Sequence, residues 1–97
     1  MPLKQPVEIV WSVLAVERPR EIQTYVGRDK PIAAARLVAR MTALVEVLRT
    51  FPYTGRIGAE PGLRELVLAG TPYIVLYRVG RNRVLIDTIW HGSQKRR

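Results

Sequence analysis

One long amphipathic segment, residues 31–48, constrains the fold more than any other feature of the sequence. Its apolar side chains recur at steps of three and four residues, which places them along one face of an α-helix. Asp29 is positioned to cap this helix, and Pro31 would occupy its first turn. Phe51–Pro52 is expected to end it, because a residue before proline avoids helical geometry. The apolar positions are Ala34, Leu37, Val38, Met41, Leu44, Val45 and Leu48.

The residues before this segment predict a strand and a second helix. Val7–Trp11 has the alternation of a short half-buried strand. Proline disrupts a helix everywhere except in the first turn, so we expect the first helix over Pro19–Arg28. Val13–Arg18 would be an irregular or helical lead-in. The two helices should form an antiparallel hairpin, because the connection between them is short. The apolar stripe of the first helix would consist of Ile22, Tyr25 and Val26.

The second half of the chain predicts a loop and three strands. Glycine and proline mark the loop and the two turns between the strands. The middle strand is apolar on both faces, which suits a central position in a sheet. The loop spans Tyr53–Gly62, and the strands span Arg64–Ala69, Tyr73–Val79 and Arg83–Trp90.

The order β-α-α-β-β-β indicates an α+β fold in two layers, with an antiparallel sheet packed against a helical hairpin. Ninety-seven residues are enough for one domain, residues 1–97, with a single core. Ser93–Arg97 is expected to be a frayed tail. The pattern leaves open which edge of the sheet carries the first strand.

The charge indicates the kind of partner. Lys and Arg number 16 against 8 Asp and Glu, a net charge of +8. This balance favours an anionic partner, which could be a nucleic acid, a ribosome or an acidic protein. The chain has no cysteine, which excludes a disulfide scaffold and suits a reducing compartment. No apolar stretch is long enough to span a bilayer or to form a signal peptide, so we expect a cytoplasmic protein without a membrane partner.

Few side chains could carry catalysis. His91 is the only histidine, and Asp87 would lie about 13 Å away along the same strand, so a surface or capping histidine is the favoured interpretation. Arg64 and Glu65 are adjacent and would point to opposite faces, which favours a cross-strand ion pair over a substrate clamp and base. One histidine without clustered carboxylates predicts no metal site, and no cofactor motif is present.

Several short motifs follow one another along nearly the whole chain. In the first half they are Arg18–Pro19, Glu21–Ile22, Tyr25–Val26, Lys30–Pro31 and Ala33–Ala34. In the second half they are Phe51–Arg56, Arg64–Val67, Gly70–Val79 and Trp90–Gly92. In this order and spacing the motifs resemble the RelE/ParE toxin superfamily, and specifically its ParE-like branch.

The resemblance implies a bacterial toxin held inactive by a cognate antitoxin, ParD-like or similar, in a pair of the kind used for plasmid stabilisation. It leaves the target open. Members of the superfamily that cleave messenger RNA on the ribosome use basic residues, and these would fall at Ile74, Glu65 and Val67 and near Gln94. That mismatch argues against a ribonuclease. ParE-like members instead inhibit DNA gyrase by trapping its cleaved DNA complex, without catalysing a reaction.

Three hypotheses follow: a gyrase inhibitor, a ribonuclease with a rearranged site, and a relic that only binds an antitoxin. Trp90 is large enough to anchor an interface with a target. A core tryptophan is an equally acceptable interpretation, because Trp90 continues the inward phase of its strand. Candidate catalytic residues for a ribonuclease are Arg64, Tyr77, Arg78 and His91. Candidate target-binding residues are Trp90, His91, Lys95, Arg96 and Arg97. Candidate antitoxin-binding residues are Arg36, Arg40, Arg64 and Tyr73.

Overall fold

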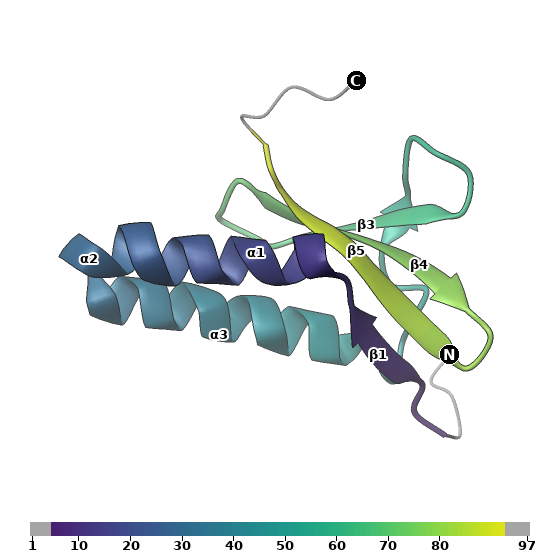
Figure 1. Ribbon diagram of the computed structural model, residues 1–97. Helices are drawn as coiled ribbons and strands as arrows, with labels where there is room; N and C mark the ends of the chain where they lie inside the picture. The colour runs from purple at the N-terminus through teal and green to yellow at the C-terminus, as the bar shows by residue number, and fades with distance from the viewer. Residues whose placement is uncertain (1–4, 93–97) are drawn as a thin grey trace.

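The computed structural model describes residues 5–92, which form a five-stranded sheet and a helical hairpin (Figure 1). The elements are β1 (Glu8–Trp11), α1 (Val13–Glu21), the π-helix η1 (Ile22–Val26), α2 (Gly27–Asp29), α3 (Pro31–Val47), β2 (Arg56–Ile57), β3 (Leu63–Val67), β4 (Tyr73–Gly80) and β5 (Arg83–His91). The strand order is β1-β5-β4-β3-β2. β1 runs parallel to β5, and the other neighbours are antiparallel. The predicted α+β fold is confirmed, with the first strand on the β5 side.

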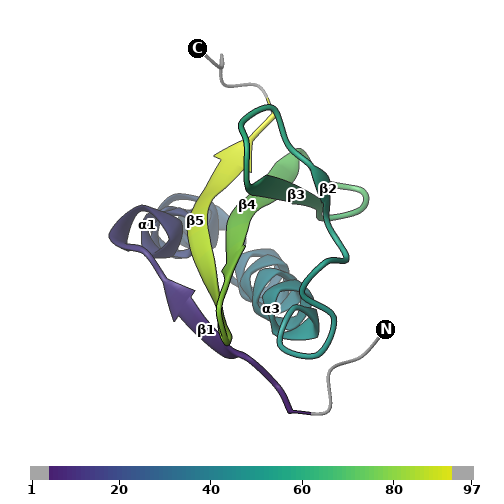
Figure 2. The same cartoon turned by 90° about the vertical axis from the view of Figure 1, so that its right-hand side faces the viewer.

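The helices cover one face of the sheet, which we call the helical face (Figure 2). Alternation along the strands places Val75 and Tyr77 of β4 on this face, where they meet the apolar stripe of α3. The opposite face, which we call the open face, carries Glu65, Val67, Ile74, Leu76, Arg78, Thr88 and Trp90. The buried core consists of Ala15, Ile22, Ala34, Met41, Val45, Leu48, Leu68, Val75, Tyr77, Val84, Ile86 and Ile89.

The first helix begins at Val13, so the lead-in over Val13–Arg18 is helical, one of its two expected forms, and the expected start of the helix at Pro19 is wrong. The Ser12 side chain caps it by accepting a hydrogen bond from the Ala15 N–H at 3.1 Å. Pro19 lies inside the helix, which nevertheless continues and widens into η1. A π-turn adds a residue to the turn and rotates the side chains that follow. Tyr25, predicted to be in the apolar stripe, is therefore 66% exposed.

The start of α3 also differs from the prediction. Its N-cap is Lys30, and no side chain caps it, so Asp29 does not have the expected role. Pro31 occupies the first turn as predicted, because proline loses no helical hydrogen bond there. The predicted apolar stripe of this helix is confirmed.

A short strand, β2, lies within the segment predicted to be a loop. Arg56 and Ile57 pair antiparallel with Glu65 and Arg64 of β3, at the edge of the sheet. A two-residue strand has too few positions to show alternation, so the sequence pattern did not reveal it. Within residues 5–92, no helix combines the length and the apolar character needed to cross a membrane.

An extra residue in β5 changes the phase of the last strand. The register between β4 and β5 shifts at Leu76 and Tyr77, and Asp87 on β5 has no partner across the ladder. Such a bulge reverses which face the following side chains point to. Ile89 therefore enters the core, and Trp90 lies on the open face. The interpretation of Trp90 as a core residue is wrong.

Candidate functional site

Tyr77 and Arg64 hold the loop that precedes β2 against the sheet. The Tyr77 side chain is 0% exposed, and its hydroxyl accepts a hydrogen bond from the Gly55 N–H at 2.7 Å. Arg64 Nη1 donates to the Gly55 carbonyl at 2.7 Å, and the guanidinium carbon lies 4.9 Å from the centre of the Tyr53 ring. Burial raises the pKa of Tyr77, against the opposing effects of the Gly55 hydrogen bond and the Arg64 charge. Both residues thus have a clear structural role.

Arg78 and Glu65 lie on the open face, and both are paired. Arg78 Nη2 lies 3.2 Å from a carboxylate oxygen of Glu60. Glu65 is only 6% exposed and accepts from Arg56 Nη2 of β2 at 3.0 Å. Glu65 therefore forms a cross-strand ion pair as expected, but Arg64 takes no part in it.

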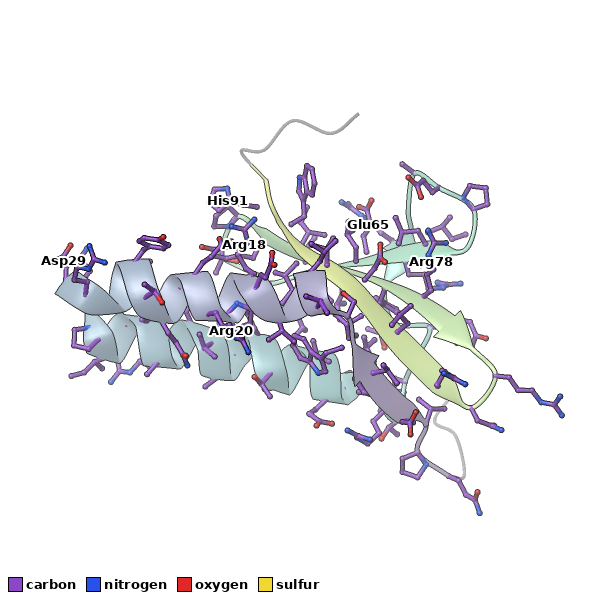
Figure 3. All side chains as sticks on the ribbon, viewed as in Figure 1. Arg18, Arg20, Asp29, Glu65, Arg78 and His91 are labelled. Atoms are coloured by element: carbon purple, nitrogen blue, oxygen red, sulfur yellow. The ribbon has the colours of Figure 1, made fainter. Side chains whose placement is uncertain are left out.

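His91 ends β5 and packs against an aromatic ring. It makes an edge-on contact with Tyr73, with the ring centres 5.1 Å apart. Arg18 lies over the same tyrosine ring at 5.9 Å, and its Nε donates to the Ile89 carbonyl at 3.1 Å. Figure 3 shows His91 and Arg18 close together above α1, with Arg78 farther along the sheet. The histidine is thus held at a strand end by its contact with the Tyr73 ring.

The four candidate catalytic side chains do not converge on one point. Arg64 lies opposite Tyr77 on the helical face, whereas Arg78 projects from the open face. His91 lies opposite Tyr73, four residues along β4 from Tyr77, or about 13 Å. A single substrate atom could not be in contact with all four.

The candidate antitoxin-binding residues fall into two groups. Arg36 and Arg40 are exposed on α3, and Arg40 Nη2 donates to the Ala69 carbonyl at 2.7 Å. Ala69 lies in the turn that leads to Tyr73, so these residues lie toward one end of the sheet. Arg64 lies toward the other end.

The candidate target-binding residues are described only in part. Trp90 lies on the open face opposite Ile74, and His91 packs on the helical face. Their side chains thus project from opposite faces. Lys95, Arg96 and Arg97 lie outside the described residues.

A cleft that the sequence did not predict runs between α1 and the end of β5. Its volume is 330 Å³, and Leu14, Arg18 and Trp90 are among the residues that line it. A smaller pocket of 140 Å³ shares Arg18 with the cleft and reaches Tyr25 of η1. Leu14 is 62% exposed. The cleft depends on the early start of α1 and on the bulge at Asp87, whereas the smaller pocket depends on the phase of η1. Of these features, only the start of α1 left a signal in the sequence, which is Ser12 at the N-cap.

The comparisons with known proteins agree on one family. A model of the ParE toxin of type II toxin–antitoxin systems (parDE) matches residues 9–96. A Sinorhizobium fredii protein named "Putative toxin Y4kP" is 45% identical over 90% of each chain. "Toxin RelE2" of Caulobacter vibrioides is 33% identical over 90% of this chain and 97% of its own length.

A solved structure described as the chromosomal ParDE TA system from P. aeruginosa has the same fold. It superposes with a TM-score of 0.79 and 23% identity, over 88% of this chain and 95% of that one. The predicted resemblance is therefore confirmed. The chain belongs to the ParE toxin family of type II toxin–antitoxin systems.

Proposed function

We propose that this toxin inhibits DNA gyrase by binding it, and that it does not cleave RNA. The observation that carries the proposal is the dispersal of Arg64, Tyr77, Arg78 and His91 over both faces and both ends of the sheet. RNA cleavage needs a base, an acid and cations gathered around one phosphate. A protein that traps another enzyme's intermediate needs only a complementary surface.

The open face supports the same conclusion. Ile74, Val67 and Glu65, at the positions where messenger-RNA-cleaving members are basic, lie together on this face. Two of them are apolar. The third is a buried carboxylate whose charge is balanced by Arg56. Such a surface suits an apolar partner better than a phosphate.

Trp90 is the residue best placed to anchor the target. It lies beside Ile74 on the open face, next to a strand end where a partner can approach. Large aromatic side chains at the centre of an interface contribute a disproportionate share of binding energy. In this proposal His91 fixes the strand end by packing on Tyr73, and Lys95, Arg96 and Arg97 follow toward an anionic target.

An acidic antitoxin segment is the proposed neutralising partner. It would lay apolar side chains into the cleft between α1 and β5 and pair its acids with exposed arginines such as Arg36 and Arg40. Leu14 is an exposed apolar residue in this cleft, and Trp90 lines the same cleft. An antitoxin bound in this cleft would cover Trp90. It would then neutralise the toxin by blocking the contact between Trp90 and the target.

The gyrase proposal is tested with purified gyrase, relaxed plasmid and ATP. We expect the toxin to block supercoiling and to leave linear DNA when the enzyme is denatured. Trp90→Ala should raise the concentration for half-inhibition by at least about tenfold, as expected for an interface anchor. Val47→Ala, an exposed apolar position on α3, is the matched control and should behave as the unmodified protein.

Unimpaired gyrase at saturating toxin would contradict the proposal. Codon-specific cleavage of messenger RNA on ribosomes, lost in Arg64→Gln or Arg78→Gln, would show a ribonuclease instead. A protein that affects neither target but still binds its antitoxin would be a relic.

The antitoxin proposal is tested by titration calorimetry with the product of the neighbouring gene. Leu14→Asp places a carboxylate in the cleft next to Glu17 and should weaken binding by at least about tenfold. Val67→Asp adds the same charge on the open face and is the matched control. Equal affinity of both variants would mean that the antitoxin binds elsewhere.

A further inference from the structure

Another pocket lies on the β2–β3 side of the sheet, away from the cleft beside α1. It has a volume of 280 Å³ and is lined by Tyr53, Ile57, Gly62, Leu63, Arg64 and Val79. Its side chains are apolar, apart from the hydroxyl of Tyr53 and the guanidinium of Arg64. Ile57 is 77% exposed at its rim, and Tyr53 is also exposed.

One side of the pocket is rigid, because the loop that forms it is bonded to the sheet through the backbone N–H and the backbone carbonyl of Gly55. The Gly55 N–H is bonded to the buried Tyr77 hydroxyl, and its carbonyl is bonded to Arg64, each at 2.7 Å. A side chain at this position would come within 2.6 Å of the Tyr77 hydroxyl, so only glycine allows the loop to lie so close. The backbone on this side of the pocket is therefore held in place and loses little conformational entropy on binding.

Arg64 supplies the one charge in the pocket, and within residues 5–92 no carboxylate balances it. It is partly buried, and it makes one hydrogen bond, to a neutral carbonyl. Nearby cations differ in this respect. Arg56 is paired with Glu65, and Arg78 is paired with Glu60. A partly buried cation without a counter-charge favours an anionic ligand, which would add charge-assisted hydrogen bonds to the guanidinium.

We propose that this pocket binds a peptide segment of a partner protein in which a carboxylate adjoins a large apolar side chain. The carboxylate would accept hydrogen bonds from Arg64, and the apolar side chain would lie among Tyr53, Ile57 and Val79. A nucleic acid fits less well, because a run of phosphates requires several available cations, and Arg56 and Arg78 are already paired. The proposal concerns a site separate from the cleft and from Trp90, so it does not depend on gyrase as the target.

Two small probes test the proposal on the full-length toxin by NMR titration. N-acetyl-L-phenylalanine carries the carboxylate, and N-acetyl-L-phenylalanine amide lacks it. We expect the acid to shift the signals of Gly55, Ile57 and the Arg64 Nε–H, and to bind about tenfold more tightly than the amide, as a charge-assisted hydrogen bond predicts.

Three variants identify the source of any binding. Arg64→Gln should remove the preference for the acid, while Arg20→Gln, at an exposed arginine on α1, should leave it unchanged. Ile57→Ala, at an exposed position that the fold does not need, should weaken both probes. Equal binding of acid and amide to the unmodified protein, or shifts that do not centre on this pocket, would overturn the proposal. Tighter binding of thymidine 5′-monophosphate than of the acid would assign the pocket to a nucleotide and overturn it as well.

Discussion

The contact between Gly55 and Tyr77 fixes the position of the loop before β2. The loop carries Tyr53 to the surface, and Gly55 bonds it to the Tyr77 hydroxyl and to the Arg64 guanidinium. A methyl group at Gly55 would lie 2.6 Å from the Tyr77 hydroxyl and 2.8 Å from the Glu65 carbonyl oxygen. Neither neighbour can move freely, since one is a buried ring and the other is backbone.

Gly55→Ala should therefore lower the free energy of unfolding by about 1–3 kcal/mol, the usual effect of overpacking. Gly27→Ala is the control. Gly27 is helical, with φ −65, and an added Cβ would meet Ala34 at an ordinary 3.6 Å. That change should be neutral or stabilise by about 0.4–1 kcal/mol. Urea denaturation of both variants measures the difference, and equal stability would show that the loop is not tightly held.

Tyr77 also predicts a pH dependence of stability. Burial raises the pKa of its hydroxyl above the ordinary 10.0, so the folded protein keeps this proton at a pH where the unfolded chain has lost it. The stabilising contribution is fully present below about pH 10 and is lost as the pH rises through the folded pKa. Unfolding free energies measured on either side of pH 10 should fall more steeply in the unmodified protein than in Tyr77→Phe. An equal pH dependence of stability in the two proteins would contradict a raised pKa of Tyr77.

The elements that the sequence predicted are those with strong periodicity. The apolar steps of α3, the alternation of β1 and the apolar run of β4 were visible because the backbone in each is regular. The features that were missed are departures from regularity. The π-turns at Ile22–Val26 and the bulge at Asp87 each shift the phase by one residue, and no sequence rule marks such a shift. The first shift exposed Tyr25 and the second moved Trp90 to the open face, so neither the smaller pocket nor the cleft could be predicted.

The bulge gives a test at the level of the strand. Because Asp87 reverses the alternation, Ile89 is 1% exposed in the core, and Trp90 lies on the open face. Ile89→Ala should lower the free energy of unfolding by about 2–5 kcal/mol. Trp90→Ala removes more atoms but should lower the free energy of unfolding clearly less. Thermal unfolding of the two variants measures this difference. A larger loss of stability in Trp90→Ala than in Ile89→Ala would show that Trp90 is a core residue.

The whole molecule combines a net charge of +8 with a sheet that helices cover on one face only. Both features suit a protein that works against anionic or apolar partner surfaces rather than on a small substrate. Deletion of residues 93–97 removes three of the positive charges. Stability and antitoxin affinity should change by no more than about 0.5 kcal/mol, as is usual away from a core. Gyrase inhibition should fall sharply. A truncated toxin that inhibits as well as the full chain would place the contact surface elsewhere.

If this toxin acts by binding gyrase, as we propose, the effect should be visible in living cells. We would induce its expression without the antitoxin and follow DNA synthesis and protein synthesis separately by pulse labelling. We expect DNA synthesis to fall first, with filamentation and DNA damage, while protein synthesis continues. An immediate halt in protein synthesis, with DNA synthesis still under way, would show that gyrase is not the target.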